Sequence, residues 1–264
     1  MNSKIIVNPT FDIAGSKNTP ALLLVHGSIV TRKLWLPQLH GLSDAYCVIA
    51  PDLPGHGTLA HIPFTFASAV QTLAEVIKRE VGGRALVAGL SLGGYVAIEL
   101  GKHHPNLVAG LVLSGCSLNF RGVLGLYLRA LSTMMQLGWF KQSSHQAELK
   151  VRQMFPPVLS DVAEAQLQAG VFPEALGASF AEISGKDFAT SLAKYSGPGL
   201  ILNGERDSAS RRGEEQFASA LSHGQVQIIP DAGHACNLDQ PEFYNRVVRV
   251  FGRSIGWITN KIEN

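Results

Sequence analysis

Apolar residues along the chain form short continuous runs, separated by longer segments with helical periodicity. The runs are rich in Leu, Val and Ile and lie at residues 5–7, 21–25, 46–50, 84–88, 107–113, 200–202 and 226–229. Continuous runs of this length are typical of strands buried on both faces of a parallel sheet. Helix-period segments lie between them, at residues 34–42, 66–80, 92–102, 213–221 and 243–251. This alternation predicts an α/β fold with a doubly wound, mostly parallel sheet, in which ligands bind beyond the carboxyl ends of the strands.

One long segment interrupts the alternation. The strand predicted to end at residue 113 and the strand predicted to begin at residue 200 are too far apart for one crossover, and the residues between them have helical patterning of their own. Long insertions in compact domains are usually lids or binding elements. We therefore expect a core made of residues 1–117 and 196–264, with a helical cap inserted at residues 118–195.

Composition and charge exclude several classes of protein. The chain is 46% hydrophobic and 16% charged, with a net charge of +2, so it is neither disordered nor attracted as a whole to nucleic acid or anionic lipid. Its cysteines, Cys47, Cys116 and Cys236, cannot all pair, which favours buried thiols in a reducing compartment. The apolar run near the start, residues 5–7, is too short for the core of a secretory signal, so we expect none. Polar residues interrupt the longest apolar neighbourhood, 123–140, so we expect no membrane span. We expect a cytoplasmic monomer or homodimer without nucleic-acid or membrane partners.

The turn at residues 89–93 contains a nucleophile motif. It reads Gly-Leu-Ser-Leu-Gly, a G-x-S-x-G sequence between a predicted strand and a predicted helix, which is the context that the motif requires. Glycines at 89 and 93 remove collisions in so tight a turn. The alternative is a phosphate-binding turn, but no Lys-Ser or Lys-Thr follows and no G-x-G-x-x-G is present. The motif therefore predicts Ser91 as an exposed nucleophile.

A serine nucleophile needs a base, and the base needs an acid to hold it in position. Of the nine histidines, His234 lies in the loop directly after the last predicted strand, where it can reach the carboxyl edge of the sheet. Asp207 follows the strand before that and is the best candidate for the acid, with Glu205 as a local alternative. A helix cap is the other interpretation of Asp207.

Acyl transfer also needs hydrogen-bond donors for the developing oxyanion. One is the backbone N–H of Leu92, directly after the nucleophile. The second is expected from the loop after the strand at residues 21–25, where Gly27 lets the chain bend so that the N–H of Ser28 points into the site.

Five segments in order, HGSI, PDLPGHG, GLSLGG, NGERD and PDAGHACNLDQPE, resemble the α/β-hydrolase superfamily, in its small members with a helical cap. The resemblance runs from about residue 5 to residue 252, apart from most of the cap. It implies Ser91 as nucleophile, Asp207 as acid and His234 as base, with Ser28 and Leu92 as the oxyanion-hole amides. No cofactor motif is present in the sequence, so we expect neither a cofactor nor a metal.

The resemblance also separates this chain from some relatives. A serine at position 91 argues against haloalkane dehalogenases and epoxide hydrolases, which have an aspartate there. It implies that His26 and His56 are mainly structural. One departure is Ser208-Ala209, where relatives commonly have Val or Pro.

We expect a serine esterase that cleaves a small, mostly apolar carboxylic ester or lactone through an acyl-enzyme. The set of Ser91, His234 and Asp207, a catalytic triad, is similar to the triads of C–C bond hydrolases, perhydrolases and hydroxynitrile lyases, so these activities are alternatives. A slow-turnover small-molecule receptor of the same fold is a further alternative. Apolar residues in and near the cap favour an uncharged substrate. The candidates for substrate binding are Trp35, Tyr127, Leu131, Met135 and Trp139.

Overall fold

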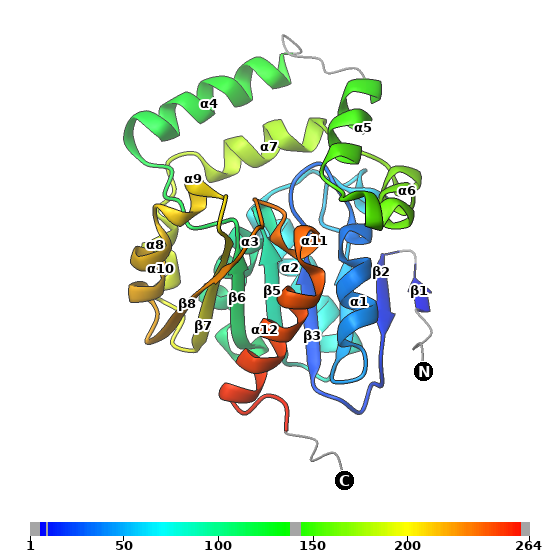
Figure 1. Cartoon of the computed structure of the whole chain (residues 1–264). Coiled ribbons are helices and arrows are strands. Elements are labelled where there is room, and N and C mark those ends of the chain that lie inside the picture. Colours follow the sequence, from blue (N-terminus) through cyan, green and yellow to red (C-terminus); the bar gives the residue numbers. More distant parts are fainter. Residues whose placement is uncertain (1–5, 9, 138–143, 260–264) are drawn as a thin grey trace.

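The computed structural model describes residues 6–8, 10–137 and 144–259 of the 264-residue chain. The described strands form one sheet in the order β1-β2-β4-β3-β5-β6-β7-β8, in which β2 pairs antiparallel with both β1 and β4 and all other neighbours pair in parallel (Figure 1). The strands are β1 (Ile6–Asn8), β2 (Phe11–Ala14), β3 (Ala21–Val25), β4 (Cys47–Pro51), β5 (Ala85–Leu90), β6 (Val108–Ser114), β7 (Pro198–Gly204) and β8 (His223–Ile229). The predicted α/β fold is confirmed.

Each predicted apolar run corresponds to one of these strands, and β2 is the strand that the pattern missed. Its sequence, FDIA, contains a charged residue in the middle of a short apolar run. Asp12 is nevertheless fully buried, because Arg32 and Lys33 pair with its carboxylate. A buried ion pair of this kind cannot be recognised from one strand alone.

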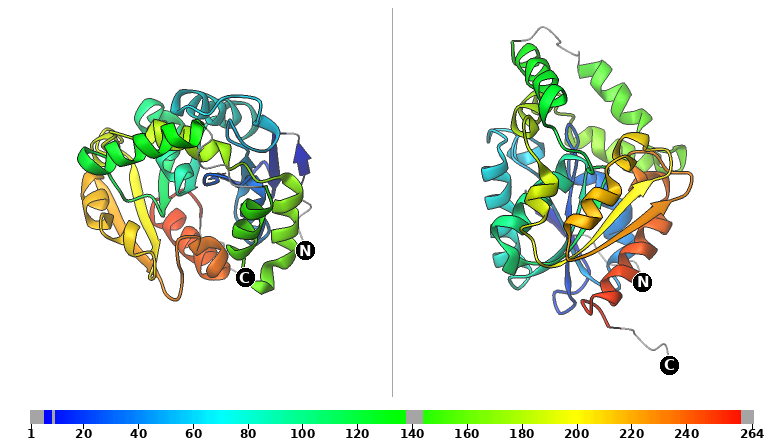
Figure 2. Two further views of the ribbon diagram at one scale, coloured as in Figure 1. Left: turned by 90° about the horizontal axis from the view of Figure 1, so that it is seen from above. Right: turned by 90° about the vertical axis from the view of Figure 1, so that its left-hand side faces the viewer.

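Helices cover both faces of the sheet (Figure 2). The core helices are α1 (Leu36–Leu42), α2 (Phe66–Glu80), α3 (Leu92–His103), α9 (Ser208–Arg211), α10 (Glu214–Ala220), α11 (Cys236–Asp239) and α12 (Pro241–Ser254). The predicted segment 34–42 begins as a short 3-10 helix, η1 (Arg32–Trp35), before α1. A capping box between Thr65 and Ser68 starts α2, and Pro241 at the first position starts α12.

Two apolar clusters lie on opposite faces of the sheet. Successive side chains of β3 alternate between them: Leu23 and Val25 join the cluster with α2 and α3, whereas Leu22 and Leu24 join the cluster with α1 and α12. This is the two-residue period of a strand buried on both faces. The sheet is thereby fixed from both sides, and its carboxyl edge forms a rigid platform for the loops of the site.

The segment between β6 and β7 contains α4 (Gly122–Gln136), α5 (Ser144–Gln153), α6 (Ser160–Ala169), α7 (Glu174–Ile183) and α8 (Phe188–Leu192). Helices α4 and α7 cross above the carboxyl ends of the strands, and α4 is the outer of the two (Figures 1 and 2). They approach closely at small residues, where the Ser132 hydroxyl donates to the Gly177 carbonyl.

Helix α8 is placed differently from the rest of this segment. It packs on α3 and α10, and its Phe188 and Leu192 belong to a core cluster. The division of the chain into a core and a cap of residues 118–195 stays a prediction, and the packing of α8 favours a cap that ends before Phe188.

All three cysteines are free and buried, as predicted. Within the part of the chain that the structure describes, no helix combines the length and the apolar character that a membrane crossing needs.

Candidate active site

Ser91 lies at the tight turn between β5 and α3. Its backbone has φ 54° and ψ −119°, a conformation that costs a residue with a side chain about 1–3 kcal/mol. A Cβ on Gly89 would overlap the carbonyl of Gly93, and a Cβ on Gly93 would overlap the carbonyl of Val25. The Ser91 N–H donates to the carbonyl of Ser114 at 2.8 Å. The glycines thus permit the strained turn, and a backbone bond to β6 holds it.

His234 and Asp207 are joined by a short hydrogen bond. The Nδ1 of His234 lies 2.8 Å from Oδ2 of Asp207, so Nδ1 carries the proton and Nε2 is left as an acceptor. The other oxygen of Asp207 accepts the N–H of Ser210 and caps α9. Burial raises the pKa of Asp207, but the hydrogen bonds from His234 and Ser210 outweigh it and hold the pKa below its usual value. The Asp207 carboxylate therefore both accepts a hydrogen bond from the His234 ring and caps α9.

Backbone bonds between the loops after β7 and β8 bring these two residues together. The N–H of Glu205 donates to the Ile229 carbonyl and the N–H of Arg206 to the Ala232 carbonyl, at 2.9 and 2.8 Å. The Glu205 carboxylate, which was the alternative acid, instead accepts the N–H of Asp231. The geometry favours Asp207 over Glu205 as the partner of the histidine.

The His234 ring reaches the nucleophile turn through Gly115. A Cβ on Gly115 would lie 2.8 Å from Cε1 of His234, so the ring lies directly against this glycine. Gly115 follows Ser114, whose carbonyl accepts the N–H of Ser91. The nucleophile turn and the histidine ring therefore contact adjacent residues at the end of β6.

The loop of residues 26–31, here called the oxyanion loop, passes beside Ser91. A Cβ on Gly27 would lie 3.4 Å from the Cβ of Ser91. Among the residues that the structure describes, the N–H groups of Ser28 and Leu92 have no hydrogen-bond acceptor. Ile29 has φ 64°, a left-handed conformation that is rare for a β-branched residue. Both amides predicted for the oxyanion hole thus belong to backbone that adjoins the serine.

Comparison with known proteins identifies the family. Residues 22–247 match the sequence model of the alpha/beta hydrolase family. The chain belongs to the alpha/beta hydrolase family.

Individual relatives agree with this assignment. A pimeloyl-[acyl-carrier protein] methyl ester esterase of Aromatoleum aromaticum is 28% identical over 244 residues, which cover 85% of this chain and 95% of that protein. A solved hydrolase from Pseudomonas aeruginosa has a TM-score of 0.74 at 25% identity, covering 95% of this chain and 98% of the other. A thermophilic esterase from Thermogutta terrifontis shares the fold, with a TM-score of 0.74, 24% identity and coverage of 96% and 99%.

In this hydrolase, two buried histidines hold the loops around the oxyanion loop. His26 donates from Nδ1 to its neighbour Gly27 and accepts the N–H of Leu53 on Nε2. His56 donates from Nδ1 to Pro54 and accepts the N–H of Ile29 on Nε2. Burial lowers the pKa of both rings, that of His56 to about 3, so each stays neutral and keeps its acceptor nitrogen. This geometry agrees with the structural role that the resemblance implied.

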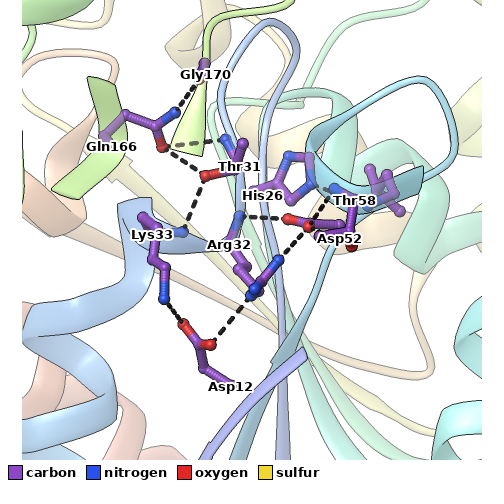
Figure 3. Close-up of polar contacts among 10 residues, drawn as sticks. Asp12, His26, Thr31, Arg32, Lys33, Asp52, Thr58, Gln166 and Gly170 are labelled. Carbon is purple, nitrogen blue, oxygen red and sulfur yellow. Dashed lines mark hydrogen bonds and ion pairs between the residues drawn. The ribbon is translucent and has the colours of Figure 1, made fainter. Parts of the chain in front are cut away.

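A buried charge network supports the same loop from the core (Figure 3). Arg32 pairs with both Asp12 and Asp52, and its backbone N–H donates to Asp52 at 3.1 Å. Asp52 also accepts the N–H and the hydroxyl of Thr58. Since removal of one partner would leave a buried charge without compensation, this network fixes the chain just after the oxyanion loop.

Asn203 is a site residue that the sequence reasoning missed. Its side chain is fully buried at the end of β7; Oδ1 accepts the N–H of Gly115 at 3.0 Å, and Nδ2 donates to Ser117 and Glu214. It therefore holds the glycine on which the His234 ring rests. The available signal was an amide at the end of an otherwise apolar strand, four residues before Asp207.

The predicted substrate-binding residues lie in different environments. Trp35 is fully buried between the sheet and α12, with its ring 5.9 Å from that of Tyr244, so the prediction that it binds substrate is not supported. Tyr127 is 62% exposed on α4, whereas Leu131 and Met135 of the same helix are half-buried. Trp139 lies outside the described residues.

No group of three or more His, Cys, Asp or Glu side chains is placed to bind a metal, as far as the described residues extend.

Proposed function

We propose that this protein is a serine esterase, in which Ser91 attacks the carbonyl of a small, mostly apolar ester or lactone, His234 is the base and Asp207 orients it. The observation that supports this best is the 2.8 Å bond from His234 to Asp207, with the ring resting on Gly115 next to the strained serine turn. That bond leaves Nε2 as the acceptor that a serine nucleophile needs.

The reaction begins with proton transfer. His234 Nε2 takes the proton of the Ser91 hydroxyl while Oγ forms a bond to the carbonyl carbon, whose π electrons move to oxygen. Collapse of this intermediate breaks the bond to the alcohol, which leaves with the proton from Nε2. Water then repeats the sequence on the acyl-enzyme, and the acid is released as the proton returns to Oγ.

The oxyanion forms beside two backbone donors, the N–H groups of Ser28 and Leu92. Leu92 is the first residue of α3, so its N–H has no acceptor within the helix and lies at the positive end of the helix dipole. Donors already in position stabilise the transition state more than the ground state, which raises kcat.

Ester hydrolysis is the activity named for several relatives of this chain, and the chain is a carboxylic-ester hydrolase. Several relatives of 25–28% identity over most of their length are named pimeloyl-[acyl-carrier protein] methyl ester esterases. Such a name describes an acyl ester of a small alcohol. A similar ester, with an uncharged acyl group near the half-buried Leu131 and Met135, is the substrate class that we propose.

The test is hydrolysis of p-nitrophenyl acetate and butyrate by the wild type, by Ser91→Ala and by Ser222→Ala, which alters an exposed serine before β8. We expect Ser91→Ala to lose at least about a thousandfold in kcat and Ser222→Ala to match the wild type. Wild-type turnover by Ser91→Ala would refute the proposal, and so would activity on charged esters alone. Tight binding of the ester with less than one turnover per hour would favour the receptor alternative.

A further inference from the structure

The oxyanion loop is held from two directions, and one of them is the 118–195 insertion. The Ser28 hydroxyl donates to the hydroxyl of Ser179 on α7, at 3.2 Å. The carbonyl of Ile29 accepts the N–H of Phe172 at 2.9 Å. Two residues of the insertion therefore contact the loop that contributes an amide to the proposed oxyanion hole.

The third contact consists of two hydrogen bonds and comes from Gln166 of α6. This side chain is fully buried, and its Oε1 accepts both the N–H and the hydroxyl of Thr31, at 3.0 and 3.1 Å. Its Nε2 donates to the carbonyl of Gly170, the residue that ends α6, at 2.8 Å (Figure 3). Both ends of the amide are occupied, so the side chain ties the end of α6 to the oxyanion loop.

Thr31 connects the Gln166 side chain to the backbone of the oxyanion loop. Its hydroxyl donates to Gln166 and accepts the N–H of Lys33, which caps η1. The buried N–H of Thr31 has Gln166 as its acceptor, and a buried donor that loses its acceptor is costly. Without this amide, the loop would have to move until the N–H of Thr31 found another acceptor or water.

The oxyanion loop is strained at Ile29, because this β-branched residue is held at φ 64°, in a left-handed conformation. Within the described part of the chain, two hydrogen bonds act directly on the Ile29 backbone: His56 accepts its N–H and Phe172 donates to its carbonyl. Ser28 precedes Ile29 directly, so a change in the Ile29 backbone also changes the direction of the neighbouring peptide groups.

We propose that Gln166 is a positioning residue for the oxyanion hole: through Thr31, it keeps the N–H of Ser28 directed at the oxyanion. This inference rests on the proposed esterase function. Gln166 does not touch the substrate, and the helix that carries it makes the geometry of the hole depend on the insertion. Because the oxyanion forms only in the transition state, loss of this amide lowers kcat and leaves KM nearly unchanged.

The experiment compares Gln166→Met with Gln168→Met. Both residues belong to α6, but Gln168 is exposed and, among the described residues, makes no hydrogen bond to the loop. We expect Gln166→Met to lower kcat for p-nitrophenyl butyrate at least tenfold, since loss of one oxyanion donor costs about 10²–10³ in kcat. KM should stay within about twofold, and Gln168→Met should match the wild type.

A second readout separates this role from a loss of stability. A trifluoromethyl ketone forms a hemiketal with a serine nucleophile, and its oxyanion needs the same two donors. We expect the Kd of this inhibitor to rise in Gln166→Met by the same factor as kcat falls. A folded Gln166→Met protein with unchanged kcat, or with an effect on KM alone, would overturn the proposal.

A second pair of variants covers the case in which Gln166→Met does not fold. Thr31→Val removes the hydroxyl donated to Gln166, and Thr31→Ser keeps it. We expect Thr31→Val to lower kcat and Thr31→Ser to restore it, whereas equal kcat in the two would overturn the proposal. Failure of the esterase function itself is seen separately, as turnover that survives Ser91→Ala.

Discussion

The two halves of the proposed active site are supported by different parts of the molecule. Ser91, Asp207 and His234 follow β5, β7 and β8, and the bonds that hold their loops come from other core residues, such as Ser114 and Ala232. The oxyanion loop follows β3 and is held by His56 on the core side and by Gln166, Phe172 and Ser179 on the side of the insertion. In the proposed mechanism, proton transfer therefore relies on residues that the core holds, whereas stabilisation of the oxyanion relies on contacts from both parts.

The largest expected effect is a loss of kcat when one of Ser91, Asp207 and His234 is changed. Asp207→Asn should lower kcat by about 10³–10⁴, because an asparagine cannot keep the proton of His234 on Nδ1 or stabilise the charged ring. Asparagine is as good a helix cap as aspartate, so α9 should keep its cap and Tm should change little. The measurement is kcat together with thermal unfolding. A drop in Tm that accounts for the lost activity would show that Asp207 acts as a cap alone.

A smaller effect is expected at the contact between the histidine ring and the core. Gly115→Ala would place a methyl group 2.8 Å from Cε1 of His234 and should displace the ring, lowering kcat by about 10–100-fold. Gly122→Ala is the matched control: Gly122 has φ +59°, close to the +61° of Gly115, but no atom lies near its added Cβ. Both variants should lose about 1 kcal/mol of stability, since alanine is strained at positive φ. Equal kcat in the two variants would contradict the role given to Gly115.

The smallest effect concerns His56, which holds the oxyanion loop from the core side. It is seen in how the free energy of unfolding changes with pH. The pKa of His56 is lowered in the folded chain to about 3, so between pH 6.5 and 3 the unfolded chain binds more protons than the folded one. The part of the folding stability that depends on neutral His56 is therefore fully present above pH 6.5 and is lost as the pH falls toward 3. Each such histidine contributes a slope of up to about 1.4 kcal/mol per pH unit.

Urea unfolding at pH 7, 6 and 5 measures this slope. His56→Gln cannot gain a proton in this range, so its free energy of unfolding should fall less steeply with pH than that of the wild type. His61→Gln makes the same substitution at an exposed position and serves as the matched control. Identical slopes in all three proteins would show that His56 is not held neutral in the fold.

The sequence predicted well the features that a short stretch of chain determines. The continuous apolar runs gave the parallel strands, and the glycines around Ser91 gave the turn, because both depend on neighbouring residues. The order of motifs also placed Asp207 and His234 on loops that the structure joins.

Features that depend on distant pairs could not be predicted in this way. The burial of Asp12 depends on Arg32, and the contact of Gln166 with Thr31 spans 135 residues. A buried glutamine in an amphipathic helix has the same local pattern as a solvated one. The same limit applies to Trp35, whose apolar ring suited a pocket and a core equally until its neighbour Tyr244 was known.

The most direct test of the central claim is to trap the acyl-enzyme. The protein is mixed with p-nitrophenyl butyrate, quenched in acid within milliseconds to seconds, digested and examined by mass spectrometry. A serine esterase built as proposed should carry one butyryl group on the peptide that contains Ser91, and Ser91→Ala should carry none. Ester turnover with no acyl group on Ser91 at any quench time, or with the group on another residue, would contradict the mechanism.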